Sequence, residues 1–252
     1  MLRNLKKAIK KLVFPDLTFK LCKRAGKLKK LGSSYGGWMV PVDYLSKDSI
    51  CYMAGAGEDI SFDCEVAKRF HCQVAIFDPT PRSKTHFDLV VKASQSMAIL
   101  PVNNNPKELY DLDKESFTSI TFYEIGLWKN TEYLKFFSPK NTSHISHSIG
   151  NLQNTSAFFM APVKRLSKIM SENDHNKLDL LKLDIEGAEF EVIDSILEDK
   201  VDVKILCIEF HLIEKEGLQK IQLAINKLEE NNFVVIAREG FDFTLINKSY
   251  LK

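Results

Sequence analysis

The chain has 252 residues, of which 44% are hydrophobic and 27% are charged; this suffices for one well-buried core but not for two domains of average size. No apolar run approaches the ~20 residues of a membrane-spanning helix, and lysines interrupt the apolar positions at the N-terminus, which argues against a secretory signal. The five cysteines form no CxxC pair, which argues against a zinc ribbon or a disulfide framework. These features predict a protein of the reducing cytoplasm.

Charge is distributed unevenly along the chain. The first 30 residues hold eleven Lys or Arg against one acid, a net +10, so the overall +2 leaves −8 for the remainder. Apolar side chains at helical spacing predict an amphipathic helix over 2–13 and a second basic helix over 16–31. The glycines of Gly32–Gly37 predict a flexible joint. We therefore divide the chain into a basic helical extension, 1–34, and a main domain, 35–252.

Two interpretations of the basic extension are open. Its apolar stripe packs on the main domain, as in many surface helices, or its lysines are attracted to an anionic membrane surface or an acidic acceptor. In the second case the protein is peripheral to the membrane. Phe14 and Phe19 are the only aromatic residues of the extension, too few for base stacking, so we expect no nucleic-acid partner.

Beyond the extension, strand and helix patterns alternate. Short apolar runs predict strands, and apolar spacing of three and four predicts helices. The predicted strands are 49–54, 72–77, 120–125, 178–183 and 203–208, the predicted helices are 60–70, 188–197 and 214–231, and a hairpin of 233–237 and 241–246 closes the chain. This order predicts a doubly wound α/β fold with a mostly parallel, Rossmann-like sheet and one antiparallel hairpin strand.

The first predicted strand runs into a glycine turn, Ala54-Gly55-Ala56-Gly57-Glu58-Asp59. Glycines let the backbone turn tightly and let a ligand approach it closely, beside the N-terminus of the next helix. Asp78 ends the second predicted strand, where an acid can accept both hydroxyl hydrogens of an adenosine ribose. This spacing is shared by dinucleotide and adenosyl cofactor sites.

The residues after the turn distinguish these two cofactors. A dinucleotide fingerprint requires a third glycine where this chain has Ile60, and Glu58 and Asp59 place negative charge where a pyrophosphate would lie. The same acids suit the cationic sulfonium and amino group of S-adenosylmethionine. We therefore predict S-adenosylmethionine as the cofactor, and an NAD-dependent oxidoreductase is the alternative.

Acidic residues gather at the end of the fourth predicted strand, where ligands bind in open α/β sheets. Asp184, Glu186 and Glu189 could orient the acceptor, hold the cofactor amino group, or ligate a divalent ion together with Glu209 and His211. Alternatively, Glu186 and Glu189 only cap the next helix. We predict active-site roles for Asp184 and Glu186 without a metal. His211 is the candidate general base, because an imidazole titrates near neutral pH.

The segment 138–157 is polar and too long for an idle connection, so we predict a functional loop. Its two histidines, His144 and His147, are three residues apart and lack a third ligand nearby, which argues against a metal site. We expect them to contact a polyhydroxylated acceptor.

Three stretches resemble the FkbM family of methyltransferases. Residues 52–81 (YMAGAGEDISFDCEVAKRFHCQVAIFDPTP) look like its first two cofactor motifs, and 180–192 (LLKLDIEGAEFEV) are similar to its K-x-D-x-E-G-x-E hallmark. Residues 207–211 (CIEFH) resemble its fifth-strand ending, so the likeness covers about 35–247 and leaves the basic extension out. The resemblance implies a class I methyltransferase fold, S-adenosylmethionine as donor, and O-methylation of a sugar-like or other small hydroxylated acceptor.

The resemblance also implies roles for individual residues. The implied contacts are to the methionine part of the cofactor for Gly55, Gly57 and Asp59, to the ribose for Asp78, and to the adenine for Gly126 and Leu127. Tyr35 and Trp38 either close over the cofactor or simply pack. A further alternative is a catalytically silent module that keeps the cofactor fold and docks on an anionic surface through its basic arm.

Overall fold

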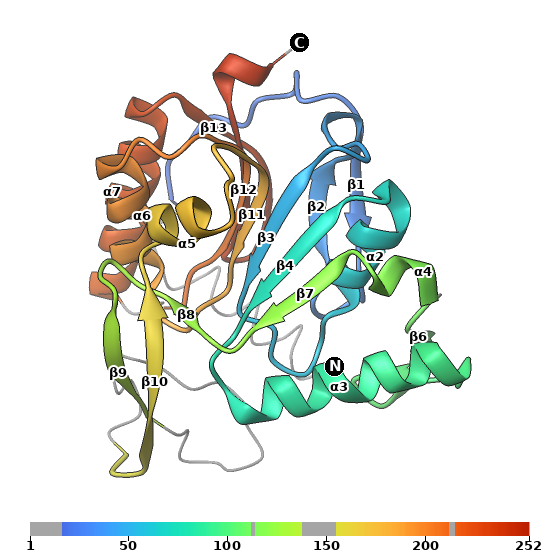
Figure 1. Ribbon diagram of the computed structural model, residues 1–252. Coiled ribbons are helices and arrows are strands. Elements are labelled where there is room, and N and C mark those ends of the chain that lie inside the picture. The colour runs from blue at the N-terminus through green and yellow to red at the C-terminus, as the bar shows by residue number, and fades with distance from the viewer. Residues whose placement is uncertain (1–16, 112–113, 138–154, 212–214, 252) are drawn as a thin grey trace.

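A seven-stranded sheet forms the centre of the molecule in the computed structural model, which describes residues 17–111, 114–137, 155–211 and 215–251 (Figure 1). Its strand order is β13-β14-β12-β11-β3-β4-β7. In chain order its strands are β3 (Ile50–Ala54), β4 (Gln73–Phe77), β7 (Ile120–Tyr123), β11 (Leu178–Leu183), β12 (Val203–Glu209), β13 (Phe233–Glu239) and β14 (Asp242–Asn247). All the strands predicted for this sheet are present.

The direction of the strands determines where a ligand site can lie. β7, β4, β3, β11 and β12 are parallel neighbours, and β14 lies antiparallel between β12 and β13. The mixed α/β architecture and the single antiparallel strand are confirmed. Since parallel strands end at one edge, the residues that follow β3, β4, β11 and β12 lie close together there.

Helices cover both faces of the sheet. On one face α2 (Ser61–Phe70) packs over a hydrophobic cluster that includes Cys51 and Met53 of β3. On the other face Tyr52 and Ala54 belong to a second cluster with three other helices. These helices are α5 (Leu166–Glu172), α6 (Glu189–Glu198) and α7 (Lys215–Glu230). Alternate residues of β3 therefore supply both cores, as the period of two in a strand requires.

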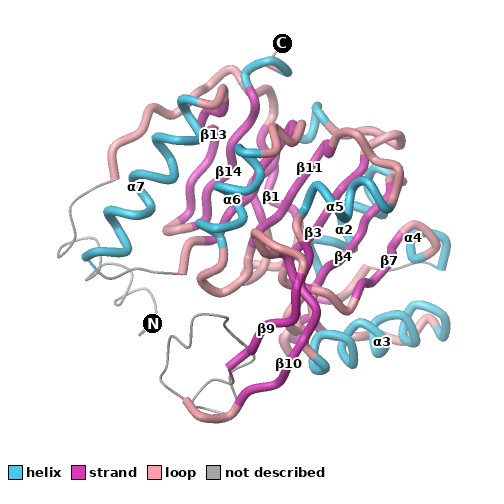
Figure 2. Tube along the Cα trace, turned by 60° about the vertical axis from the view of Figure 1, so that its left-hand side comes forward, coloured by secondary structure: helices cyan, strands magenta, loops and turns pink. Residues whose placement is uncertain are grey.

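Several elements were not predicted from the sequence. These are the helices α3 (Pro81–Ser96), α4 (Lys114–Phe117) and α5, the 3-10 turns η1 (Val42–Tyr44) and η2 (Lys248–Tyr250), and the strands β5 (Pro101–Val102), β6 (Asn105–Leu109), β8 (Gly126–Leu127), β9 (Glu132–Phe137) and β10 (Phe158–Lys164). Strands β8, β10 and β9 form a small sheet whose β9–β10 ribbon projects from the body (Figure 2). For α3, Pro81 at the first helical position was an available signal.

The predicted helix over 16–31 is wrong for the described residues. Leu28–Leu31 form β1, which pairs antiparallel with β2 (Trp38–Pro41). Upstream, the Cys22 amide donates to the Val235 carbonyl, and the Phe19 ring packs edge-on against Phe243 with centroids 5.5 Å apart. These contacts with the main domain override the local helical spacing. The predicted boundary after residue 34 falls within the β1–β2 turn.

The remaining predictions concern membrane-spanning helices and two segments of the chain. Among the residues that the structure describes, no helix is both long and apolar enough to cross a membrane. The predicted helix over 2–13 lies outside the described residues. So do residues 138–154 of the predicted functional loop, which include His144 and His147.

Candidate active site

The glycine turn is fixed by the contact between β3 and β11. Gly55 has φ +85°, and a Cβ built on it would lie 1.7 Å from the carbonyl oxygen of Asp184. The Asp184 amide donates to the Ala54 carbonyl at 3.0 Å, which draws the two strand ends together. Only glycine fits this backbone approach. Gly55 therefore joins the predicted cofactor turn directly to the predicted acidic cluster.

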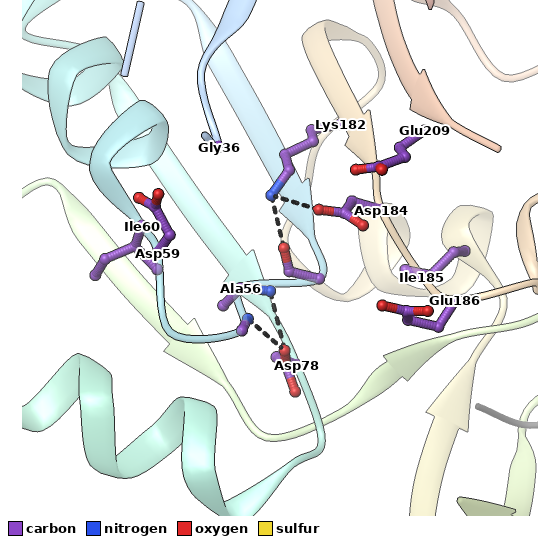
Figure 3. A network of polar contacts seen from close by, with 12 residues as sticks. Gly36, Ala56, Asp59, Ile60, Asp78, Lys182, Asp184, Ile185, Glu186 and Glu209 are labelled. Carbon is purple, nitrogen blue, oxygen red and sulfur yellow. Dashed lines mark hydrogen bonds and ion pairs between the residues drawn. The ribbon is translucent and has the colours of Figure 1, made fainter. Parts of the chain in front are cut away.

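Asp78, at the end of β4, binds the glycine turn from below. Its Oδ2 accepts the amides of Ala56 at 2.9 Å and Gly57 at 3.1 Å, as Figure 3 shows. The same oxygen accepts the Ser83 hydroxyl, and Oδ1 accepts both the amide and the hydroxyl of Thr80. With five protein donors, this buried carboxylate holds the turn in place. A ribose would have to replace the hydroxyls of Thr80 and Ser83 as donors.

Asp59, at the other end of the turn, holds the β1–β2 hairpin. Its carboxylate accepts the Ser33 hydroxyl at 2.6 Å, the Asn103 amide group at 2.7 Å and the Ser61 backbone amide at 3.0 Å. The Ser33 hydroxyl in turn accepts the Gly36 amide. The predicted flexible joint over 32–37 is therefore wrong: it is a hydrogen-bonded hairpin turn, because polar side chains from α2 and its neighbours satisfy its backbone.

Lys182 is a buried cation beside the glycine turn. Only 2% of the residue is exposed, and its ammonium donates to the Gly55 carbonyl at 2.6 Å and lies 3.7 Å from Asp184 Oδ2 (Figure 3). Burial lowers the pKa of Lys182, but the charges of Asp63 and Asp184 outweigh it and the pKa is raised. Asp63 on α2 is fully buried, and neither of its oxygens has a hydrogen-bond partner among the residues that the structure describes. Burial raises its pKa from 3.8 to about 6.

The acidic cluster gathers around His211, which follows β12. Its Nε2 lies 3.5 Å from Asp184 Oδ1 and 3.7 Å from Glu186 Oε1. Its Nδ1 N–H donates to Glu189 Oε1 at 2.8 Å. Glu189, wholly buried at the start of α6, also accepts the Gly187 amide, but no side-chain hydrogen bond caps this helix. The structure thus brings together the three predicted catalytic residues, Asp184, Glu186 and His211.

Electrostatics at this cluster favour positive charge. Burial lowers the pKa of His211, but the hydrogen bond and charge of Glu189 and the charges of Glu186 and Asp184 raise it to about 10. Burial and the charge of Asp184 raise the pKa of Glu209 to about 8. An imidazole with a pKa near 10 is protonated at neutral pH. It acts as a base only after a nearby cation, such as a sulfonium, has lowered that pKa.

Of the remaining predicted site residues, Gly126, Leu127 and Trp38 are buried and Tyr35 is exposed. Leu127 is 2% exposed and belongs to the core of α5–α7. A Cβ on Gly126 would meet Val163, Phe136 and Pro79, the residue after Asp78. Trp38 is buried at 5% exposure, whereas Tyr35 in the hairpin turn is 64% exposed. Trp38 therefore packs in the core.

The comparison with protein families bears on this arrangement. The methyltransferase FkbM domain matches residues 54–235. The chain belongs to the FkbM methyltransferase family. That match begins at the glycine turn and takes in the ends of β4, β11 and β12. The methyltransferase interpretation of the sequence is therefore confirmed at the level of the family. No curated protein matches the chain.

Sequence reasoning missed two residues of the site and underrated a third. Lys182 and Asp63 were not singled out, although a lysine inside the apolar run LDLLKL is unusual, because lysine is almost never fully buried without a partner. Glu189 was weighed only as a cap or as one acid among three. Its hydrogen bond to His211 depends on the meeting of two strand ends, which no local pattern reveals.

Proposed function

We propose that this FkbM-family protein transfers a methyl group from S-adenosylmethionine to a hydroxyl of a sugar-like or other small hydroxylated acceptor. The observation that supports the proposal is the direct contact between the glycine turn and the acidic cluster, both within the matched family domain. The glycine turn closes against the Asp184 carbonyl, and Asp184 itself lies in an acidic cluster. A cofactor held at the turn has its reactive centre beside groups able to orient a hydroxyl.

The fold and its charge agree with this proposal. A parallel sheet with one antiparallel hairpin strand, β14, between β12 and the edge strand β13 agrees with the class I methyltransferase fold. A sulfonium is a permanent cation, and the carboxylates of Asp184, Glu186 and Glu209 on one side of the glycine turn favour it over the anionic pyrophosphate of NAD (Figure 3).

Each residue has a defined task in the proposed reaction. The backbone of Gly55 and Gly57 and the carboxylate of Asp59 shape the pocket for the methionine part, and Asp78 fixes the turn and faces the ribose. Gly126, beside Pro79, lies on the adenine side. Asp184 and Glu186 orient the acceptor hydroxyl, and His211 takes its proton as the oxygen attacks the methyl carbon in line with the breaking carbon–sulfur bond.

Cofactor binding tests the proposal without knowledge of the acceptor. Calorimetry with S-adenosylmethionine and with NAD is carried out on the parent chain, on Asp78→Ala and on the control Asp88→Ala. Asp88 lies on α3 with a 58% exposed side chain. Circular dichroism checks that each variant is folded.

We expect micromolar binding of S-adenosylmethionine to the parent and to Asp88→Ala, at least ~10-fold weaker binding to Asp78→Ala, and no binding of NAD. Because Asp78 also supports the turn, its loss removes both the ribose acceptor and the turn geometry. A folded parent chain that binds NAD, or that does not bind S-adenosylmethionine, would refute the proposed cofactor.

A further inference from the structure

We propose that Asp184, Glu186 and His211 form a binding site for a divalent metal ion, with Glu189 as the residue that orients the histidine. This departs from the sequence-based prediction of no metal. Its use in catalysis rests on the proposed methyl transfer but replaces the role of His211 as base: an ion bound here would hold the acceptor oxygen and ease the loss of its proton to solvent. The binding of the ion itself does not depend on that function.

The spacing of the ligand atoms suits one ion. One oxygen from each of Asp184 and Glu186 and one ring nitrogen of His211 all lie within 4.8 Å of one another. With bonds of about 2.1 Å, an ion holds neighbouring ligand atoms ~3 Å apart and opposite ones ~4 Å apart. Small side-chain rotations therefore bring all three atoms onto one ion. The three residues come from the ends of two adjacent parallel strands, which fixes their separation.

The histidine is already oriented as a ligand. Its Nδ1 N–H donates to Glu189 at 2.8 Å, and Glu189 is held by the amides of Ile185 and Gly187. Metal-ligating histidines commonly donate their second ring nitrogen to a carboxylate, which fixes the tautomer and turns the free lone pair towards the metal. His211 Nε2 makes no hydrogen bond with any residue that the structure describes, although carboxylate oxygens of Asp184 and Glu186 lie 3.5 and 3.7 Å away.

Charge and access also favour an ion. Oε1 of Glu209 lies 4.0 Å from the same Nε2 and adds a further negative group. The side chains of Asp184, Glu186 and His211 are 29%, 26% and 17% exposed, so the cluster is partly sheltered from solvent. This leaves room for water or an acceptor hydroxyl as additional ligands. Lys182 compensates Asp184 from the buried side, opposite the cluster.

The ligand set selects the class of ion. Two carboxylates suit Mg²⁺, Ca²⁺ and Mn²⁺, whereas an imidazole ligand favours the transition metals. Mn²⁺ satisfies both preferences. The alternative is that His211 carries a proton and pairs with the acids without any metal.

Direct metal binding distinguishes these alternatives. Chain treated with EDTA and dialysed is titrated with MnCl₂, and binding is followed by calorimetry and by the electron paramagnetic resonance signal of free Mn²⁺. The variants are Asp184→Asn, Glu186→Gln and Glu189→Gln. Glu198→Gln is the control, since Glu198 on α6 has a 67% exposed side chain and lies outside the cluster. Thermal unfolding verifies that each variant folds.

We expect one Mn²⁺ site in the parent and in Glu198→Gln, and at least ~10-fold weaker binding in Glu186→Gln and Asp184→Asn. Glu189→Gln should weaken Mn²⁺ binding by about 10- to 100-fold, as is usual when a residue that hydrogen-bonds a metal ligand is replaced. Absence of Mn²⁺ binding, or equal binding by Glu186→Gln and the parent, would overturn the site. A chain that binds S-adenosylmethionine but does not bind Mn²⁺ would overturn this inference alone. A chain that binds Mn²⁺ but does not bind S-adenosylmethionine would overturn the proposed function alone.

Discussion

Replacement of Gly55 by alanine tests whether the junction of the glycine turn with β11 holds the site together. The new Cβ would lie 1.7 Å from the Asp184 carbonyl oxygen, and both partners are backbone, so the ends of β3 and β11 must separate. At φ +85° an alanine costs about 1–2 kcal/mol, and the added volume costs about 1–3 kcal/mol more. We expect the free energy of unfolding to fall by about 2–5 kcal/mol.

The chain offers a matched control in Gly26. Its φ is +71°, but a Cβ there would meet the movable carboxylate of Asp43 at 3.1 Å, so Gly26→Ala should lose only the backbone part, about 1–2 kcal/mol. Urea unfolding followed by circular dichroism measures both variants. If Gly55→Ala loses no more stability than Gly26→Ala, the close approach of β3 and β11 does not determine the turn, and our account of the junction is wrong.

Three further predictions concern buried charges and the hairpin turn. Because the pKa of Asp63 is raised from 3.8 to about 6, the folded chain holds this proton more tightly than the unfolded chain, so its contribution to stability is lost as pH rises from about 4 to about 6. This loss amounts to ~3 kcal/mol, and Asp63→Asn should flatten this part of the curve of unfolding free energy against pH; an unchanged slope would contradict it. Lys182→Met leaves buried carboxylates uncompensated and should cost about 3–5 kcal/mol in urea unfolding, whereas parental stability would show that the ammonium is dispensable. Asp59→Ala removes the acceptor for Ser33 and should speed amide hydrogen exchange over 32–37; unchanged exchange would mean that the hairpin is held by other contacts.

The candidate site was only partly accessible to sequence reasoning. Asp184, Glu186 and His211 were placed correctly at strand ends because parallel strands share an edge. Their electrostatics were not, since His211 was expected to titrate near neutral pH and its pKa is about 10. The carboxylates of Glu189, Glu186 and Asp184, which all follow β11, raise the pKa of His211 and outweigh the lowering effect of burial. The spacing of residues in the sequence does not reveal how many charges surround His211 in the folded chain.

Local pattern alone determined the central sheet. The run LDLLKL gave β11 with the predicted bounds, because a strand buried on both faces needs a continuous apolar run whatever its neighbours are. The glycine turn was equally readable, since only glycine tolerates the backbone of Gly55. The hairpin of β1 and β2 could not be predicted from local pattern, because Leu28–Leu31 has helical spacing. This segment is a strand because it pairs with Trp38–Pro41 through backbone hydrogen bonds.

The sequence by itself therefore determined where the strands of the central sheet lie along the chain, the glycine turn and the residues at each strand end, because these depend on neighbours a few positions away. The tertiary structure decided what those residues touch. In the folded chain Asp78 accepts hydrogen bonds from the backbone of the turn, Lys182 is buried near Asp63, and Glu189 accepts a hydrogen bond from His211. These contacts join residues that lie far apart in the chain, and they exist only once the sheet has aligned its strand ends.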